Sequence, residues 1–389
     1  MGAPGGVEAS PTMRRLATPA LLAALLYAAL HAAQEAAPAR PKVDVGQIGG
    51  AQFAIAHPPG DWNHNLLLIA HGFRPLDAPL VPDLRPERAA IREFLDEGWM
   101  VATTSYRRNG LVIGDAIADL DALRAYVAES YGDPARVILE GDSMGGLIVT
   151  LIAERDNGLY QGAVAFDPTL YIKDANSNLG LTLLPRIPLL FVATQGEAKQ
   201  AKSYITAIVS RPPPVVPPRL FLISRMGHTN INQPERVLAF RAINAWVEHG
   251  PDALPKPAEN RPFFDSTVPP DPFQSTVAMH PGNHGFDTTV DEVDAVYGTV
   301  LLEAQASDFD VAGIAPMTYF QMRTGAGTFR VLYGRNYTDV ESGQWVAFPD
   351  ADGRTALARA FGSAAAAAGL KVGDTVALDM QEPHPSGSP

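Results

Sequence analysis

Short apolar runs alternate with amphipathic stretches over roughly the first two thirds of the chain. Short apolar runs of this kind are typical of strands buried on both faces of a sheet. They lie at residues 66–70, 100–104, 137–139, 162–166, 189–193 and 220–223. Residues 87–97, 115–129 and 235–248 carry apolar side chains three and four positions apart, as amphipathic helices do. The alternation predicts an α/β fold with a doubly wound, mostly parallel sheet, and residues 43–57 predict an antiparallel hairpin that leads into it.

The pattern changes after a proline-rich stretch at residues 251–272, which we interpret as a linker because proline clusters oppose both helix and internal strand pairing. The apolar runs that follow are short and bounded by glycine or turn residues. They lie at residues 299–302, 329–333, 345–348 and 375–379. This pattern predicts a smaller, mostly-β accessory domain over residues 273–389, either a barrel or a sandwich. Residues 364–368 predict one short helix within it.

Composition excludes several function classes. The chain has 389 residues, a formal net charge of −12 and no cysteine. Its length predicts more than one domain. The negative charge and the lack of a basic stripe argue against nucleic acid as a partner. The absence of cysteine excludes disulfides, thiolate metal sites and a cysteine nucleophile.

The first 39 residues have the layout of a secretory signal peptide. Arg14 and Arg15 precede an apolar run over residues 16–33, and small residues follow up to position 39. We therefore expect an exported protein, periplasmic or secreted, that has no membrane contact after cleavage. The alternative is an uncleaved membrane anchor, because the run is close to the minimum spanning length.

The strongest chemical signal is a G-x-S-x-G motif, from Gly141 to Gly145, directly after an apolar run. Such a motif predicts a sharp turn from a strand into a helix with Ser143 at its tip. Glycines are needed there because the backbone of the nucleophile is strained and the helix packs close to the strand. The predicted reaction class is attack of an activated hydroxyl on an acyl carbon.

A serine nucleophile needs a base and an orienting carboxylate, in the chain order serine, acid, histidine. His228 follows the run 220–223 and is the candidate base. Two acids lie at predicted carboxyl ends of strands: Glu197, which we prefer for its position, and Asp167 as the alternative. Asp142 lies inside the turn itself, and we interpret it as a local structural residue.

An oxyanion hole needs two backbone donors. One is the amide of Met144, the residue after the nucleophile, and the other is the amide of Phe73, in the loop after residues 66–70. His71 in that loop could be mistaken for the base, but we expect it to shape the loop.

These motifs make residues 43–250 resemble an α/β-hydrolase of the esterase, lipase and peptidase superfamily. The resemblance rests on His71-Gly72, on the serine motif and on Gly227-His228 followed by a closing helix. It implies an eight-stranded sheet and a Ser–His–acid triad. The chain departs from the family pattern at the acid, where Gln195-Gly196-Glu197 replaces the usual Gly-x-x-Asp. Only about twenty residues separate the run ending at Phe166 from Pro188, where such enzymes insert a lid, so we expect an open site.

Residues from about 290 to 380 are similar to the C-terminal β-domain of S-adenosylmethionine hydroxide adenosyltransferases and related halogenases. The similarity rests on residues 293–300 and 354–378, although Thr299 replaces the asparagine usual in that family. No counterpart of the family's catalytic domain is recognisable in the sequence, so adenosyl chemistry is not implied. His280, His284 and Asp287 nearby are spaced like metal ligands only on a helix, which Pro281 and Gly282 oppose, so we expect no metal.

The sequence therefore predicts an exported serine esterase that acts on a small or polymeric carboxylic ester and needs no cofactor. A peptidase or lactonase of the same superfamily is the near alternative. A non-catalytic binding protein that retains the fold is the alternative from another class, although it would have no chemical need for both Ser143 and His228. The acyl group, the alcohol group and the oligomeric state stay open.

Overall fold

The computed structural model describes Gly2 and residues 41–380, except for residues 156–157, 173–178, 210, 212–213 and 255–263. Apart from Gly2, the predicted signal peptide at residues 1–39 lies outside the described residues. The described residues from Pro41 to Met380 belong to one compact unit, within which a sheet with helices and a β-barrel follow one another along the chain. None of the helices among these residues combines the length and the hydropathy that a membrane span requires.

A nine-stranded sheet forms the centre of the first domain, in the order β1-β2-β4-β3-β5-β6-β7-β8-β9. The strands are β1 (Val43–Ile48), β2 (Ala51–Ala56), β3 (Asn65–Ala70), β4 (Met100–Thr104), β5 (Arg136–Asp142), β6 (Gly162–Phe166), β7 (Leu189–Thr194), β8 (Arg219–Ile223) and β9 (Phe264–Asp265). The first two form the predicted antiparallel hairpin, and β2 is antiparallel to β4. From β4 to β9 every pairing is parallel, which confirms the predicted doubly wound α/β fold.

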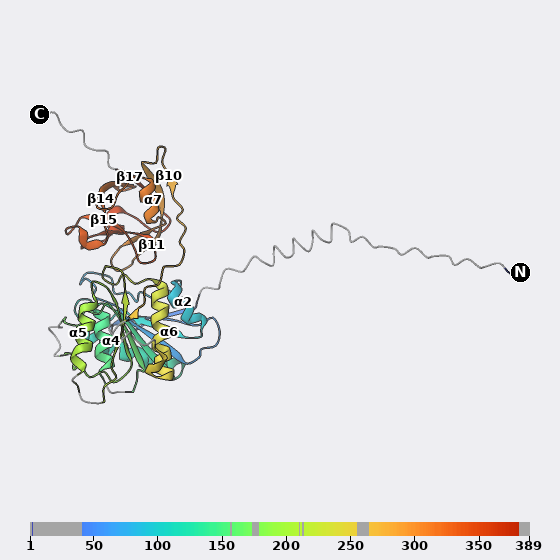
Figure 1. The fold of residues 1–389 in the computed structure, drawn as a ribbon, viewed down its shortest axis with the longest axis vertical. Coiled ribbons are helices and arrows are strands. Elements are labelled where there is room, and N and C mark those ends of the chain that lie inside the picture. Colours follow the sequence, from blue (N-terminus) through green and yellow to red (C-terminus); the bar gives the residue numbers. More distant parts are fainter. Residues whose placement is uncertain are drawn as a thin grey trace. The chain divides into compact units, whose positions relative to one another are not determined.

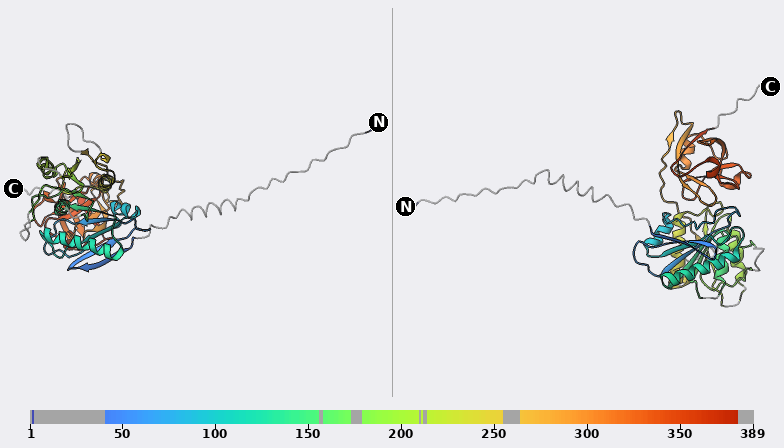
Figure 2. Two further views of the ribbon diagram at one scale, coloured as in Figure 1. Left: turned by 90° about the horizontal axis from the view of Figure 1, so that it is seen from below. Right: turned by 180° about the vertical axis from the view of Figure 1, so that it is seen from behind.

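Helices cover both faces of this sheet. They are α2 (Ala89–Asp96), α3 (Ile113–Tyr131), α4 (Met144–Ala153), α5 (Ala198–Ile208) and α6 (Gln233–His249). One apolar core joins α3, α4 and α5 to one face, and a second joins α2 and α6 to the other. Figure 1 shows α4 and α5 on one side of the sheet and α6 on the other, and Figure 2 shows the long α3, in blue-green, across the sheet.

The sheet has one strand more than the resemblance implied. The ninth, β9, contains only two residues and pairs in parallel with β8. It lies in the stretch 251–272 that we interpreted as a linker, which also contains a short 3-10 helix, η1 (Pro251–Ala253). A two-residue strand at an edge needs few backbone donors, so it can form where prolines exclude a longer one. Residues 255–263 of the predicted linker lie outside the described part.

The second domain is a β-barrel. Its strands are β10 (Ala278–Met279), β11 (Gly285–Val293), β12 (Val300–Leu302), β13 (Tyr319–Thr324), β14 (Gly327–Tyr333), β15 (Trp345–Pro349), β16 (Thr355–Arg359) and β17 (Thr375–Met380). Pairing of β11 with β17 closes seven of them, while β10 adds to the edge of β11. Two helices, α7 (Ala306–Val311) and the predicted α8 (Ala364–Ala368), and a 3-10 turn, η2 (Tyr337–Asp339), join the strands. The interior contains Phe286, Phe309 and Phe320, all fully buried. The prediction of a smaller, mostly-β domain is confirmed.

Candidate active site

Ser143 lies at a sharp turn between β5 and α4. It has a φ of +55°, a left-handed conformation that is unfavourable for a residue with a side chain. The turn is possible because Gly145 packs directly against β3. A Cβ atom at Gly145 would lie 2.0 Å from the carbonyl oxygen of Ala70, which no side chain can tolerate. The strained backbone that the G-x-S-x-G motif predicted is therefore present, and it presents the Ser143 hydroxyl at the carboxyl edge of the sheet.

His228 reaches Ser143 from the loop after β8. The Nε2 atom of His228 lies 2.8 Å from the Oγ atom of Ser143. On the other side of the ring, Nδ1 lies 3.5 Å from the Oε2 atom of Glu197, which follows β7. With the proton of the neutral ring on Nδ1, Nε2 accepts the hydrogen bond from the serine hydroxyl. The structure thus brings Ser143, His228 and Glu197 together in the order that nucleophilic catalysis requires.

Asp167, the alternative acid, makes different contacts. Its carboxylate is fully buried and accepts the backbone N–H groups of Thr194 and Thr229, each at 2.7 Å. Burial raises the pKa of Asp167 to about 7, against the opposing effect of these two amides. Among the described residues it forms neither a hydrogen bond nor an ion pair with the ring of His228. Asp167 therefore holds the two loops that carry Glu197 and His228.

Two backbone amides are free next to Ser143. Among the described residues, neither the N–H of Phe73 nor that of Met144 has a hydrogen-bond partner. Gly72 packs against the serine, since a Cβ atom there would lie 3.4 Å from the Cβ atom of Ser143. Unpaired donors beside a nucleophile are what an oxyanion requires. Both amides are therefore available for an oxyanion, and the roles of Phe73 and Met144 as its donors stay predictions.

His71 fixes the loop that carries Phe73. Its Nδ1 atom donates to the carbonyl oxygen of Gly72 at 2.7 Å, and its ring stacks on Tyr106 with centroids 3.8 Å apart. Burial lowers the pKa of His71 to about 3, with a further contribution from the charge of Arg74. The ring is therefore neutral, and its bond to Gly72 fixes the plane of the peptide that ends in the Phe73 amide. This is the loop-shaping role that we expected.

A buried ion-pair network under the turn was not predicted. Arg236 of α6 lies 2.7 Å from the Oδ1 atom of Asp142 and 3.2 Å from the Oε1 atom of Glu140, and it stacks on the ring of Phe166. Burial raises the pKa of Glu140 to about 7, although the charge of Arg236 opposes this. Asp142 thus has a structural role, as expected, but through a partner ninety-four residues away and not within its own turn. No signal in the sequence connects these positions.

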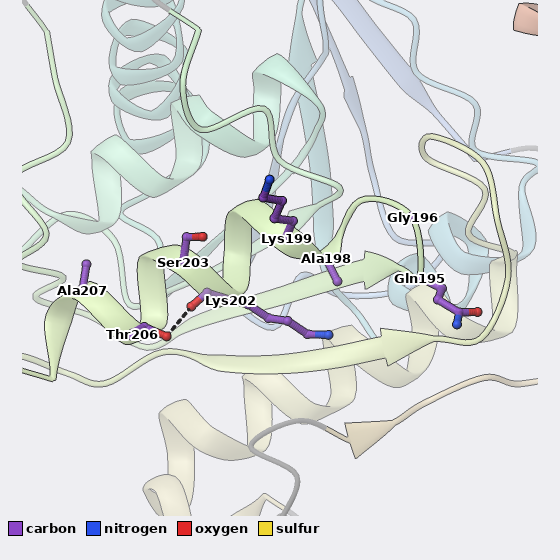
Figure 3. Close-up of a pocket in the computed structure, with 8 residues that line it drawn as sticks. All are labelled: Gln195, Gly196, Ala198, Lys199, Lys202, Ser203, Thr206 and Ala207. Atoms are coloured by element: carbon purple, nitrogen blue, oxygen red, sulfur yellow. Dashed lines mark hydrogen bonds between the residues drawn. The ribbon is translucent and has the colours of Figure 1, made fainter.

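A surface pocket of about 570 Å³ lies along α5, next to the turn that carries Glu197. Figure 3 shows Lys199 and Lys202 projecting in different directions from the helix, so the two cations do not converge on one point. The pocket is lined by Gln195, Gly196, Ala198, Lys199, Lys202, Ser203, Thr206 and Ala207. Ser143 and His228 do not line it, so it is separate from the reacting atoms.

The histidine cluster of the second domain is an ion-pair cluster. His280 contacts Asp379 at 2.8 Å through Nδ1 and Asp287 at 2.9 Å through Nε2. Its hydrogen bond to Asp287 raises the pKa of His280, although slight burial opposes this, and Asp379 adds to the effect. Both ring nitrogens are therefore occupied. Within the described residues, no group of histidine, aspartate and glutamate side chains could hold a metal ion.

Two family models match separate segments of the chain. The model of the prolyl oligopeptidase family matches residues 113–181, and the model of the SAM hydroxide adenosyltransferase C-terminal domain matches residues 288–377. The first segment contains the Ser143 turn, and the second confirms the resemblance noted for the β-domain. The sheet topology is that of an α/β-hydrolase fold, and the β-barrel that follows is similar to the SAM hydroxide adenosyltransferase C-terminal domain.

Solved structures similar to this chain come from several organisms. An uncharacterized conserved protein from Thermotoga maritima is 20% identical over 34% of this chain and 48% of its own, with a TM-score of 0.25. An α/β serine hydrolase homologue from Coxiella burnetii is 15% identical over 53% of this chain and 96% of its own, with a TM-score of 0.38. An acylaminoacyl peptidase from Pyrococcus horikoshii is 10% identical over 60% of this chain and 45% of its own, with a TM-score of 0.41.

The chain spans about half the length of the first and third of these proteins. Their identities and TM-scores are too low to transfer a function to this chain. A search among curated proteins finds no relative that matches it.

Proposed function

We propose that this chain is a serine hydrolase that cleaves carboxylic esters through an acyl-enzyme intermediate. The observation that carries the proposal is the contact of 2.8 Å between Ser143 and His228, beside two unpaired backbone amides. A nucleophile, a base and oxyanion donors at one sheet edge are the parts that acyl transfer needs. A carboxylic ester is the simplest substrate that these parts can cleave.

In the acylation step, the Oγ atom of Ser143 attacks the ester carbonyl carbon while His228 Nε2 takes the hydroxyl proton. The carbonyl oxygen becomes an oxyanion that accepts the N–H groups of Phe73 and Met144. The bond from carbon to the alcohol oxygen then breaks, and His228 returns its proton to that oxygen. Glu197 stabilises the imidazolium that exists between the two proton transfers.

In the deacylation step, water attacks the acyl carbon of the ester on Ser143, and His228 again accepts a proton. Collapse of the second oxyanion breaks the bond to Oγ and returns the proton to it. The products are one carboxylic acid and one alcohol, and the proposed steps use no cofactor. His228 must be neutral at the start of each step to act as the base.

Hydrolysis of a p-nitrophenyl ester series, from acetate to palmitate, tests the proposal. The wild-type protein is expected to turn over at least one member, and Ser143→Ala to lose that turnover. The chain-length profile then sizes the acyl-binding region. Activity that survives in Ser143→Ala would overturn the assignment of the nucleophile.

A peptidase is the second candidate, because the matched family over residues 113–181 is that of prolyl oligopeptidase. The same residues can cleave an amide, with His228 protonating a leaving amine in place of an alcohol. Matched p-nitroanilide and p-nitrophenyl substrates separate the two candidates. Amide turnover at a rate comparable with the ester would favour the peptidase.

A binding protein that retains the fold is the candidate from another class. It requires neither a strained serine nor a histidine in contact with it, yet both are present. Failure of a fluorophosphonate probe to label Ser143 in folded protein would favour this alternative.

We also propose that the protein is exported, because residues 1–39 have the layout of a signal peptide. Cell fractionation and N-terminal sequencing of the exported form test this. Retention of the intact N-terminus in a membrane fraction would indicate an uncleaved anchor.

A further inference from the structure

A tyrosine of the β-domain contacts the loop that carries one of the free amides. Tyr297 lies in the turn between β11 and β12, and its hydroxyl donates a hydrogen bond to the carbonyl oxygen of Phe73. Tyr297 and Phe73 are each a little under half exposed, at 46% and 43%. The contact joins residues 224 positions apart. The β-domain thus contacts the carbonyl group of the same residue whose N–H is the proposed oxyanion donor.

The turn that carries Tyr297 has a fixed geometry. The Oδ1 atom of Asp294 accepts the N–H groups of Val296 at 2.8 Å and of Tyr297 at 2.6 Å. Gly298 follows with a φ of +66° and packs so closely on Ser363 that a Cβ atom would lie 1.9 Å from its hydroxyl oxygen. A turn held on both sides loses little further entropy when it contacts a neighbour, so it can position that neighbour.

Charged contacts hold the two segments together beside the tyrosine. Arg85, which lies on the same connection between β3 and α2 as Phe73, forms an ion pair with Asp294 at 3.3 Å and another with Glu292. The side chain of Arg85 is only 10% exposed, so these pairs are shielded from solvent. These ion pairs hold the turn that carries Tyr297 beside the loop that carries Phe73, and they support the hydrogen bond between the two residues.

The conformation of Phe73 depends on its two flanking peptides. The peptide before it, which supplies the proposed donor N–H, is fixed by the bond from His71 to the carbonyl of Gly72. The peptide after it is held through its carbonyl by Tyr297. When both peptide planes are fixed, the φ and ψ angles of Phe73 are fixed as well. Removal of the Tyr297 anchor frees the peptide after Phe73, so that the segment carrying the donor is held on one side only.

We infer that Tyr297 is a positioning residue of the hydrolase site, which aims the Phe73 amide at the oxyanion through its hydrogen bond to the Phe73 carbonyl. The β-domain is then a working part of the active site. This inference rests on the proposed function. Loss of a whole oxyanion donor costs about 10²- to 10³-fold in rate. A donor that remains but is loosely held costs less, so we expect Tyr297→Phe to lower kcat about tenfold with little change in KM.

The test compares Tyr297→Phe with wild type and with Tyr319→Phe. Tyr319 is a matched control because it belongs to the same domain, is half-buried on β13 and makes no side-chain hydrogen bond among the described residues, and its ring contact with Arg330 is kept by phenylalanine. The first measurement is the second-order rate constant for phosphonylation of Ser143 by a fluorophosphonate, whose P–O group occupies the oxyanion site. The second is kcat and KM for the best p-nitrophenyl ester. Thermal unfolding of each variant monitors the fold.

We expect Tyr297→Phe to slow phosphonylation and kcat by a similar factor, while Tyr319→Phe and wild type react alike. Arg85→Gln, which keeps the hydroxyl but releases the turn, should change the rate in the same direction. If Tyr297→Phe unfolds early, Arg85→Gln carries the test. Equal rates in wild type and both variants would overturn this inference and leave the proposed function intact. Absence of labelling in wild type would overturn the proposed function, and this inference with it.

Discussion

The carboxylate of Asp167 accepts the backbone N–H of Thr229, the residue directly after His228, at 2.7 Å. The same carboxylate accepts the N–H of Thr194, three residues before Glu197. One buried acid thus ties together the two loops that supply the proposed base and its orienting partner. Asp167, the alternative acid of the sequence analysis, therefore holds the two loops in place, whereas Glu197 is the acid that faces the imidazole.

The two carboxylates should respond differently to amide substitution. Glu197→Gln removes the charge that stabilises the imidazolium, and we expect kcat to fall on the order of 10²- to 10⁴-fold with the fold intact. Asp167→Asn keeps one acceptor oxygen but replaces the other with a donor that faces backbone N–H groups. We expect it to lower unfolding stability by about 1–3 kcal/mol and kcat less than Glu197→Gln does. Steady-state kinetics and denaturant unfolding on both variants check this, and the reverse ranking in kcat would assign the triad to Asp167.

Titration of Asp167 should contribute to the pH dependence of the free energy of unfolding. Burial raises its pKa in the folded chain to about 7, from 3.8 in the unfolded chain. The folded state therefore binds this proton more tightly, and the contribution to stability is full below the unfolded value and lost as pH rises through about 7. We expect the free energy of unfolding of Asp167→Asn to fall less steeply than that of wild type between pH 4 and 7. Equal slopes for the two proteins would contradict the raised pKa.

Arg236 should be among the most sensitive positions for stability. Its removal leaves Glu140 and Asp142 without their cation, and Glu140 is almost fully buried. Breaking a buried ion pair from one side typically costs about 3–5 kcal/mol, which we expect for Arg236→Met. Arg241→Met on the same helix is the control, because the side chain of Arg241 is 60% exposed and its pair with Glu93 should contribute at most about 1 kcal/mol. Chemical denaturation measures the free energy of unfolding of both variants. Similar losses in the two would contradict the larger stabilisation that we expect from the buried network.

Gly145 should tolerate no side chain. A methyl group there would overlap the carbonyl oxygen of Ala70, which belongs to the central strand β3. We expect Gly145→Ala to move the Ser143 turn and abolish fluorophosphonate labelling. The control is Gly373→Ala in the β-domain, where open space surrounds the site, although its φ of +88° adds some strain. Labelling of Gly145→Ala at the wild-type rate would contradict the close packing of the turn.

The sequence was informative where local pattern decides structure. The central strands follow from apolar runs because a parallel sheet buries both faces. The turn at Ser143 follows from glycine spacing, and the carboxyl ends of parallel strands then put Asp167, Glu197 and His228 at one edge. The helix α5 was missed, although Ala198, Ala201 and Tyr204 have helical spacing, because alanine gives a weak apolar signal.

The sequence was uninformative where distant residues meet. Nothing local links Arg236 to Asp142, or Tyr297 to Phe73, since each pair meets only when the strands and turns are in place. The sequence also could not tell which of Asp167 and Glu197 faces the imidazole, because both acids follow strands. In the structure Asp167 faces a backbone N–H group, whereas Glu197 faces the ring of His228.

The central claim is that Ser143 is an activated nucleophile held by His228. The most direct measurement is hydrolysis of the p-nitrophenyl ester series by wild type and by Ser143→Ala, with fluorophosphonate labelling of both in parallel. We expect turnover and labelling in wild type and neither in the variant. Well-folded wild-type protein that neither hydrolyses an ester nor takes up the probe would contradict it.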